Sequence, residues 1–391
     1  MLKPRLKVTF GAHVEKRARI MVVGAGTLGT QVLQGLAHSS SPRTLSLVGR
    51  SEESVVRAAN LACLSAVQRG YAPEVGYAIC SLDDIAHMAE NISQFEPHII
   101  FSSASLQSWW FINNLPKDKF ERIYSANFGP WLPMHLAPVA KLMQAVRMAG
   151  SGAFVINAAY PDAVHPALKG AGLSPHLGIG NVANNVPALR VIAAERLGCG
   201  VERVQVRFVA HHYVSHRISR MGDANPRTFH LTVQCDGHDV TPGVDVGTIF
   251  KPLLVKYRRV GGLAGTFMTT SSALSVLEPL ADGTASEVHA PGFDGMHGGY
   301  PVRLNAGRAE LDLPGGVTPS AAREINIIGQ REDGIADIDG NGYITFEEAS
   351  MQVMQDELGY RCPKMHWSEA DGWARELAAR YRAYAPQTRT P

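Results

Sequence analysis

The chain has 391 residues, of which 45% are hydrophobic and 18% charged, an ordinary balance for a globular protein with room for two domains. A formal net charge of +2 argues against a dedicated nucleic-acid binder, which concentrates basic residues on one face. The N-terminal segment has no apolar stretch typical of a secretory signal, and no apolar run is long enough to predict a membrane span. Five scattered cysteines predict reduced thiols in a cytoplasmic protein, with no disulfide framework and no metal site.

The most informative motif lies near the N-terminus. Residues 19–29 read RIMVVGAGTLG, an apolar strand that runs into G-x-G-x-x-G, and a segment with helical apolar spacing follows. Such glycines allow a tight turn, a close approach of the backbone to a pyrophosphate, and close packing of helix against strand. The N-terminus of the helix offers N–H groups to the phosphates. The motif therefore predicts a dinucleotide site, with contacts from Gly24, Gly26, Thr27, Leu28 and Gly29.

The first part of the chain alternates strands with helices. We expect further strands at residues 44–48, 98–102 and 153–157. Helices are expected at residues 52–68, 82–92 and 137–148. This alternation is typical of a parallel sheet with crossover helices. After residue 157 the pattern changes, with a helix at 187–197, a strand at 204–209, a helix at 269–280 and a strand at 300–304.

The end of the second strand bears on the choice of cofactor. Folds that prefer NAD usually carry an acidic residue here, which binds the adenosine ribose hydroxyls. This strand instead ends in Gly49-Arg50-Ser51. A guanidinium and a hydroxyl suit a 2′-phosphate, so we expect Arg50 and Ser51 to bind NADP, with NAD as the alternative. In the other interpretation, Arg50 is a solvated loop residue.

The middle of the chain resembles a known family. Residues 204–213 read VQVRFVAHHY and are similar to the strand that leads into the catalytic histidine of the lactate/malate dehydrogenase superfamily. Residues 178–190 resemble the helix that carries the aspartate and the carboxylate-binding arginine of that family. Residues 301–314 resemble its closing hairpin. The order of these motifs, from about residue 19 to residue 313, is more specific than any one of them.

The resemblance implies a fold of the α/β class. A Rossmann dinucleotide-binding domain is expected over residues 18–157 and an α+β substrate domain over residues 158–315. A C-terminal extension, with a hairpin and helices, is expected over residues 316–391. The family also implies a homodimer or homotetramer that acts on a small-molecule substrate, with no nucleic-acid or membrane partner.

The resemblance also implies residue roles. His212 matches the catalytic histidine, and Asn157 matches an asparagine near the nicotinamide, with Tyr160 as the alternative. We further expect Ser103, which follows the strand at 98–102, to contact the cofactor. Histidine suits this role because its pKa lies near neutrality, so it can protonate an alkoxide or amine as hydride arrives.

The departures from the family pattern concern the substrate. Asn185 stands where the family has the aspartate partner of the histidine, and Ala188 stands where it has the carboxylate-binding arginine. The loop after Ser102 contains no arginine either. Because a bidentate Arg–carboxylate contact is a strong orienting interaction, its loss argues against lactate and malate. Trp109 and Trp110 in that loop suggest a bulkier or aromatic substrate.

Asn185 would also affect the acid–base chemistry. An amide does not stabilise an imidazolium as a carboxylate does, so we expect Asn185 to leave His212 a weaker acid–base group. His211 and His216 are neighbours that could take over its role. A replacement anion site could come from three other residues, Arg190, Arg217 and Arg220.

Residues 337–348, DIDGNGYITFEE, fit the EF-hand calcium loop at every position. An EF-hand needs an incoming helix, yet the preceding stretch contains Gly329, Asp333 and Gly334, and no second loop is present to pair with it. We therefore favour a hairpin with a turn at Asn341-Gly342, followed by a helix near Glu347. A calcium loop is the alternative.

Together these features predict an NAD(P)-dependent oxidoreductase. It would transfer hydride to or from a carbonyl or imine of a substrate other than simple lactate or malate, with a histidine as acid–base. One alternative is an opine-type enzyme, which condenses an amine with a carbonyl and reduces the imine. Another is a dinucleotide-binding sensor or scaffold that has lost catalysis.

Overall fold

The computed structural model describes residues 17–305 and 307–385, without the side chains of Trp109 and Trp110. Its first sheet has six parallel strands in the order β3-β2-β1-β4-β5-β6. These strands are β1 (Ala18–Val23), β2 (Arg43–Gly49), β3 (Glu74–Ile79), β4 (Ile99–Ser102), β5 (Phe154–Asn157) and β6 (Leu177–Gly178). The parallel sheet confirms the α/β class expected from the alternating pattern. Because β6 pairs with β5, this sheet continues past residue 157.

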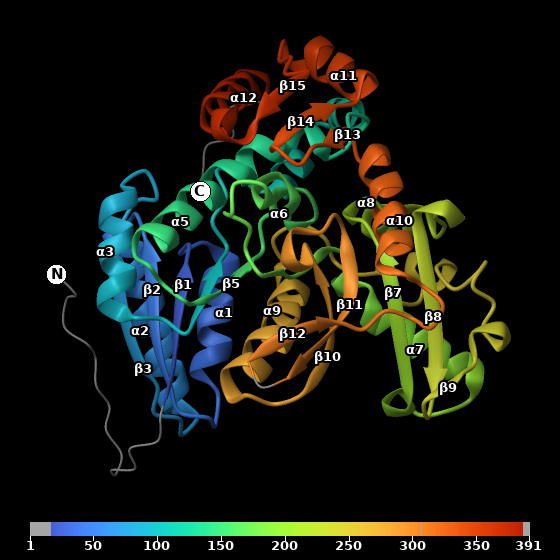
Figure 1. The fold of residues 1–391 in the computed structure, drawn as a ribbon, viewed down its shortest axis with the longest axis horizontal. Coiled ribbons are helices and arrows are strands. Elements are labelled where there is room, and N and C mark those ends of the chain that lie inside the picture. Colours follow the sequence, from blue (N-terminus) through green and yellow to red (C-terminus); the bar gives the residue numbers. More distant parts are fainter. Residues whose placement is uncertain (1–16, 306, 386–391) are drawn as a thin grey trace.

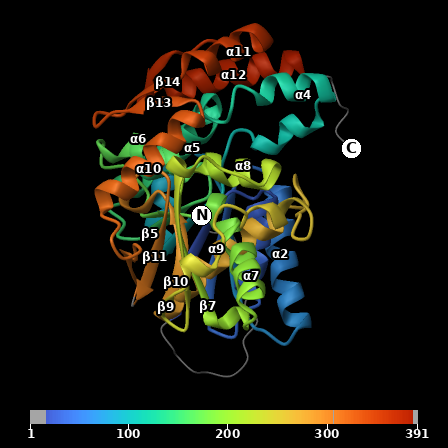
Figure 2. The ribbon, with the colours of Figure 1, turned by 90° about the vertical axis from the view of Figure 1, so that its right-hand side faces the viewer.

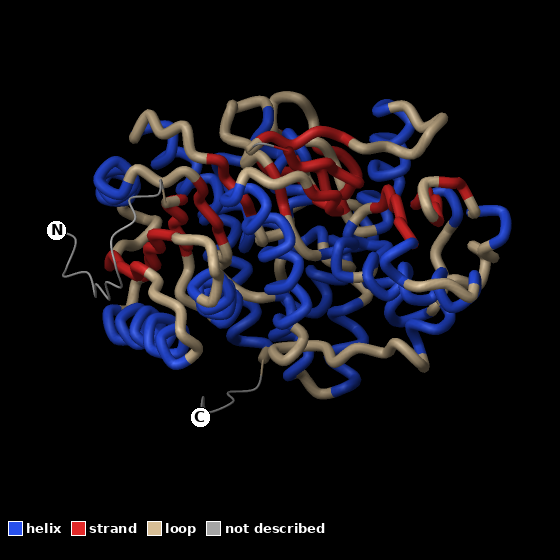
Figure 3. Tube along the Cα trace, turned by 90° about the horizontal axis from the view of Figure 1, so that it is seen from below, coloured by secondary structure: helices blue, strands red, loops and turns tan. Residues whose placement is uncertain are grey.

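Helices cover both faces of this sheet (Figures 1 and 3). They include α1 (Thr27–Ala37), α2 (Glu52–Gln68), α3 (Ile85–Phe95) and α5 (Leu132–Met148). Side chains point alternately to the two faces of a sheet, so the side chains of β1 are divided between two apolar cores. Ile20 and Val22 pack with α1 and α2, whereas Met21 and Val23 pack with α3 and α5. The strands are therefore apolar on both faces, as parallel sheets require.

A second sheet is mainly antiparallel and lies beside the first (Figure 1). It has the order β10-β11-β7-β8-β9, with β12 paired to β11. Its strands are β7 (Val204–Ala210), β8 (Phe229–Cys235), β9 (His238–Asp239), β10 (Ser286–Pro291), β11 (Gly299–Asn305) and β12 (Arg308–Leu311). The accompanying helices are α6 (Pro161–Lys169), α7 (Val186–Leu197), α8 (His212–Met221) and α9 (Thr266–Asp282). Sheet and helices form the α+β part expected after the Rossmann sheet.

The C-terminal part packs back onto the first domain. After α10 (Pro319–Glu332), a small sheet forms from β13 (Ile335–Ile338), β14 (Tyr343–Phe346) and β15 (Lys364–His366). Helices α11 (Glu348–Leu358) and α12 (Ala370–Tyr384) accompany it, close to α5 and α4 (Lys117–Tyr124) (Figures 1 and 2). Met351 and Leu377 belong to the same apolar core as Leu136 of α5. Shared burial therefore fixes the C-terminal part against the Rossmann sheet.

The segment that matches the calcium loop is a hairpin, β13 and β14, followed directly by α11. Asp339 Oδ1 accepts hydrogen bonds from the N–H groups of Asn341 and Tyr343, both at 2.9 Å. Glu348, at the last position of the motif, forms an ion pair with Arg361 at 2.6 Å. Within residues 17–305 and 307–385, no three His, Cys, Asp or Glu side chains are grouped so as to hold a metal ion.

The helices over the same ranges include none with the length and apolar character needed to cross a membrane. The five cysteines are all free thiols.

The glycine turn predicts a stability difference between two substitutions. A Cβ added at Gly29 would lie 1.9 Å from the carbonyl oxygen of Gly24, whereas one added at Gly26 meets no atom within 4 Å. Overpacking of this kind typically costs about 1–3 kcal/mol. Gly29→Ala should therefore lower the free energy of unfolding in urea by about that amount, while Gly26→Ala should leave it nearly unchanged. Equal stabilities of the two variants would contradict this packing.

Candidate active site

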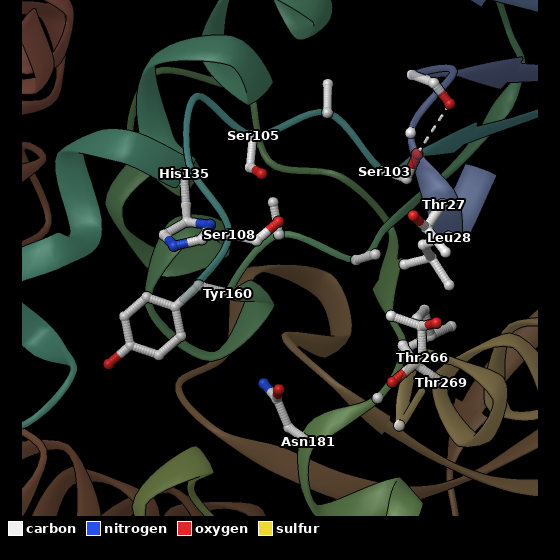
Figure 4. Close-up of a pocket in the computed structure, with 18 of the residues that line it drawn as sticks. Thr27, Leu28, Ser103, Ser105, Ser108, His135, Tyr160, Asn181, Thr266 and Thr269 are labelled. Carbon is white, nitrogen blue, oxygen red and sulfur yellow. Dashed lines mark hydrogen bonds between the residues drawn. The ribbon is translucent and has the colours of Figure 1, made fainter. Parts of the chain in front are cut away.

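A cavity of about 1230 Å³ lies where the first sheet faces α8 and the loop before α9. The glycine turn forms one end, with Gly24 at φ +108° and Gly26 as the N-cap of α1, where no side chain caps the helix. Thr27 and Leu28 line the same end, and Figure 4 shows them beside Ser103. The uncapped N–H groups and the open space at Gly26, where an added Cβ would meet no atom within 4 Å, fit a pyrophosphate, so the residues present suit a dinucleotide.

Three further residues of the predicted cofactor site line this cavity. Arg50 is exposed at the end of β2, next to Ser51. Ser51 Oγ accepts a hydrogen bond from Ser54 N at 3.3 Å and so caps α2, which leaves its hydroxyl proton available to a ligand. Ser103 Oγ donates to the carbonyl oxygens of Val23 and Gly24, at 3.3 and 3.2 Å, and so braces the glycine turn.

His212 is the first residue of α8 and lines the opposite part of the cavity. Its ring Nδ1 lies 2.8 Å from Oδ2 of Asp333, and its side chain is 5% exposed. The rings of Phe128, Tyr160 and His216 surround it, with centroids 4.6, 5.1 and 4.5 Å away. The imidazole is thus held in one orientation by an ion pair and by aromatic packing.

Asp333, immediately after α10, supplies the carboxylate beside His212. The same Oδ2 also accepts a hydrogen bond from the Tyr160 hydroxyl at 2.7 Å. Burial favours the neutral form of Asp333, but the charge and hydrogen bond of His212 outweigh it and lower its pKa to about 2. Burial likewise lowers the pKa of His212, yet Asp333 and Asp162 together raise it above its ordinary value. The structure therefore favours an imidazolium–carboxylate pair.

Asp162, in the first turn of α6, fixes the start of α8. Its Oδ1 accepts a hydrogen bond from the backbone N–H of His212 at 2.8 Å, and its Oδ2 accepts one from Asn181. Burial raises its pKa to about 6, against the opposing charge of His212. A carboxylate at the N-terminus of α8 also complements the helix dipole.

The structure corrects the expected partnership of Asn185. The side chain of Asn185 hydrogen-bonds Ser215, Ser219 and Arg259. The partner of His212 is Asp333, from a part of the chain where the family resemblance no longer applies. The expectation that His212 lacks a carboxylate, and is weakened for that reason, is therefore wrong.

Asn157 closes β5, but its side chain is committed to the local turn. Its Oδ1 accepts from Ala159 N at 2.9 Å, its Nδ2 donates to Ala159 O at 3.0 Å, and it lies 3.2 Å from His165. The residue is fully buried. Tyr160, the alternative from the sequence, lines the cavity, and its ring lies next to that of His135 (Figure 4).

The neighbouring histidines differ from His212 in charge. His211 is fully buried, with its Nδ1 3.7 Å from Asp333. His216 and His135 line the cavity. Burial, reinforced by the charge on His212, lowers the pKa of His216 and of His135 to about 3. Burial likewise lowers the pKa of His211 to about 3. His212 is thus the one histidine of these four whose pKa is raised, by its contact with Asp333.

Of the three arginines proposed from the sequence as an anion site, two are held by other protein groups and one lines the cavity. Arg190 donates to the carbonyl oxygens of Val204 and Val201, at 2.9 and 3.2 Å, and Arg217 pairs with Asp223 at 2.9 Å. Arg220 lines the cavity. The side chains of Trp109 and Trp110, proposed as apolar substrate contacts, lie outside the described residues.

Solved structures with the same fold are lactate and malate dehydrogenases. The lactate dehydrogenase of Cryptosporidium parvum, complexed with lactic acid and nicotinamide adenine dinucleotide, is 16% identical over 82% of this chain and 96% of its own, with a TM-score of 0.57. The lactate dehydrogenase of Eimeria maxima, with NADH and oxamate, is 14% identical over 82% of this chain and 96% of its own, also with a TM-score of 0.57. The malate dehydrogenase of Plasmodium falciparum, with NADH, is 11% identical over 81% of this chain and 96% of its own, with a TM-score of 0.53.

These likenesses confirm the expected fold, a Rossmann domain followed by an α+β domain of the lactate/malate dehydrogenase type. No protein-family model matches the chain, and no curated protein matches its sequence.

The buried pair predicts a pH window for stability. The pKa of Asp333 is lowered to about 2, so its contribution is present above its unfolded pKa of about 4 and is lost as pH falls towards 2. The pKa of His212 is raised, so its contribution is present below about 6.5 and is lost as pH rises through the folded-state pKa. The pair therefore stabilises the fold most between about pH 4 and 6.5.

Asp333→Asn leaves a buried imidazole without its counter-charge, a change that typically costs about 3–5 kcal/mol. In urea unfolding, the free energy of unfolding of this variant should fall furthest below that of wild type between about pH 4 and 6.5. The difference between the two proteins should be smaller above neutral pH. Asp223→Asn, at an exposed ion pair, is the control and should show little change. A deficit of Asp333→Asn that is independent of pH would contradict the ion pair.

Proposed function

We propose that this chain is an NAD(P)-dependent dehydrogenase or reductase in which His212 is the acid–base group. The observation that carries the proposal is one cavity with the glycine turn at one end and the His212–Asp333 pair at the other. The fold likeness to dehydrogenases solved with NAD or NADH supports it. By the same likeness, we expect a homodimer or homotetramer that acts on a small molecule.

The residues divide the chemical work. A nicotinamide dinucleotide, when bound, supplies or accepts the hydride. Because Asp333 occupies Nδ1 of His212, the proton that moves to or from the substrate is carried on Nε2. Asp333 keeps the imidazolium charged until that transfer, and Tyr160 orients Asp333 through its hydroxyl. General acid–base catalysis of this kind contributes about 10²–10⁴-fold.

The substrate in this proposal is a carbonyl or imine other than that of simple lactate or malate. Ala188 lies on α7 where the resembling family has its carboxylate-binding arginine. The nearby Arg190 is held by backbone carbonyl oxygens. An α-carboxylate next to the reacting carbon would therefore lack the bidentate partner that orients it.

NADP is the preferred cofactor in this proposal. Arg50 and Ser51 stand together at the end of β2, and Ser54 and Ser81 line the same part of the cavity. A guanidinium and several hydroxyls provide charge and donors for a 2′-phosphate, while the strand end has no carboxylate to bind a free ribose hydroxyl.

Titration with NADPH and NADH tests this preference. Wild type should bind NADPH more tightly, because charge-assisted hydrogen bonds to the 2′-phosphate are absent with NADH. Arg50→Ala should weaken NADPH binding by about tenfold or more and leave NADH binding nearly unchanged. Arg57→Ala, one helical turn into α2 and paired with Glu53, is the control. Equal affinities of wild type for the two cofactors, or tighter NADH binding, would overturn the preference.

Substitution of His212 tests the catalytic role. His212→Ala should keep cofactor affinity and lower turnover by about 10²–10⁴-fold, as expected when a general acid–base group is removed. His211→Ala should cost much less, because that ring is fully buried and its pKa is lowered to about 3. Comparable losses in the two variants would indicate a shared network. Full activity of a folded His212→Ala protein would remove this residue from the mechanism.

The alternatives give different outcomes in the same assays. Opine-type reductive condensation would make cofactor oxidation depend on added amine. A sensor or scaffold would bind NADPH without turnover across carbonyl and imine panels. The inactive alternative is supported by the absence of both the aspartate and the arginine of the family pattern. Asp333 provides a carboxylate beside His212, so only the missing arginine still favours that alternative.

A further inference from the structure

The cavity has an uneven distribution of charge. Among the described residues that line it, Asp83 is the one acidic side chain, and it forms an ion pair with Lys141 at 2.5 Å. The end near α8 instead contains guanidinium groups, those of Arg220, Arg258 and Arg259. This end therefore carries net positive charge, which attracts anions.

Arg220 continues a row of side chains along α8. His212, His216 and Arg220 are spaced by four residues and so share one helical face. The guanidinium carbon of Arg220 lies 4.0 Å from the ring centroid of Tyr124 and 5.4 Å from that of Phe120. Cation–π contacts hold a guanidinium in place without neutralising its charge.

Arg259 reaches the same end from the loop before α9. It donates to the carbonyl oxygen of Asn184, to Oδ1 of Asn185 and to Oγ of Ser219 at 3.4 Å. These three acceptors are neutral. The asparagine at position 185, where an aspartate would cancel the charge, therefore leaves Arg259 oriented but not compensated.

Arg220 follows His216 by four residues on α8, and Arg259 hydrogen-bonds Ser219 of the same helix. The charges of Arg220 and Arg259 both act on His216, whose ring centroid is 4.5 Å from that of His212. Eight residues of α-helix separate the Cα atoms of His212 and Arg220, or about 12 Å along the axis. The backbone positions of Arg220 and of the proton-exchanging residue are therefore about two helical turns apart.

We propose that the substrate carries an anionic group, carboxylate or phosphate, at the end remote from its reacting carbon, and that Arg220 and Arg259 bind this group. The inference rests on the proposed function and refines its substrate class. The inference explains both departures from the family pattern. Ala188 removes the arginine that would bind a carboxylate next to the reacting carbon, and Asn185 leaves Arg259 free to bind an anion from the loop before α9, together with Arg220 of α8.

Binding to the protein–NADPH complex tests the inference without turnover. The probes are pentanoate, n-butyl phosphate and pentan-1-ol, which have similar chain lengths and differ in the terminal group. Calorimetry should detect at least one of the anions and show much weaker binding of the alcohol. The stronger of the two anions identifies the carboxylate or the phosphate as the preferred group.

Arg220→Gln and Arg259→Gln should each weaken binding of that anion by about tenfold or more, because a charge-assisted contact is lost. Arg220→Lys should recover part of the affinity. Arg217→Gln, on the same helix but paired with Asp223, is the matched control and should bind as wild type does. An equal loss in the Arg217 variant, or equal binding of the alcohol and the anions, would overturn the inference.

The two proposals fail in different ways. Absence of binding of both NADPH and NADH would contradict the proposed function, and the anion probes would then be measured on the free protein. With NADPH bound, a series of ω-oxo acids provides the kinetic test. The kcat/KM should rise with chain length from glyoxylate, and Arg220→Gln should raise KM for the long members but not for neutral aldehydes. A maximum at glyoxylate would contradict the remote position of the anion.

Discussion

The buried contact between His212 and Asp333 is the interaction on which the candidate site depends. Removing two charges from water is costly, and such a pair is tolerated only with good geometry and further hydrogen bonds. Both are present here, because the 2.8 Å contact is joined by the Tyr160 hydroxyl at 2.7 Å. The backbone of Asp333 is held as well, since its carbonyl oxygen accepts from Gly129 N at 2.6 Å. A Cβ at Gly129 would lie 2.7 Å from that oxygen, so a glycine is required there.

This contact gives the C-terminal part a role beyond packing. Asp333 lies between α10 and the small sheet of β13 to β15, and those elements share a core with α5. The carboxylate that charges His212 is therefore positioned by a segment that follows the α+β domain. By the family resemblance, the carboxylate partner of the histidine was expected at position 185, just before α7, where this chain has an asparagine. Position 185 is then free to hold Arg259 through a neutral contact.

Local patterns predicted much of the fold and part of the candidate site. The glycine motif, the alternation of strands and helices and the strand before His212 each depend on neighbours in sequence. The structure shows them where expected, except that β3 was not predicted. Helix α5 begins at Leu132, five positions before the expected start, because Pro133 lies in its first turn and Pro138 is accommodated inside it. Prolines normally argue against a helix interior, so the pattern there was misleading.

The partner of His212 was not predictable in the same way. Asp333 lies in a Gly-rich stretch that carries no catalytic pattern, and only the packing of α10 against β7 and α8 brings it to the histidine. Asp162 was missed for a similar reason, because its contact with the start of α8 depends on tertiary structure. Tyr160, considered as an alternative to Asn157, could be placed only once the turn after β5 was seen to occupy the Asn157 side chain.

The pKa of the His212 imidazole tests the central claim most directly. Proton–carbon NMR of histidine-labelled protein, with His212→Ala to assign the resonance, gives this value in wild type and in Asp333→Asn. The account predicts a pKa above about 6.5 in wild type, and a pKa below it in the variant, because burial is then opposed only by the smaller effect of Asp162. A pKa below 6.5 in wild type, or equal values in the two proteins, would contradict it.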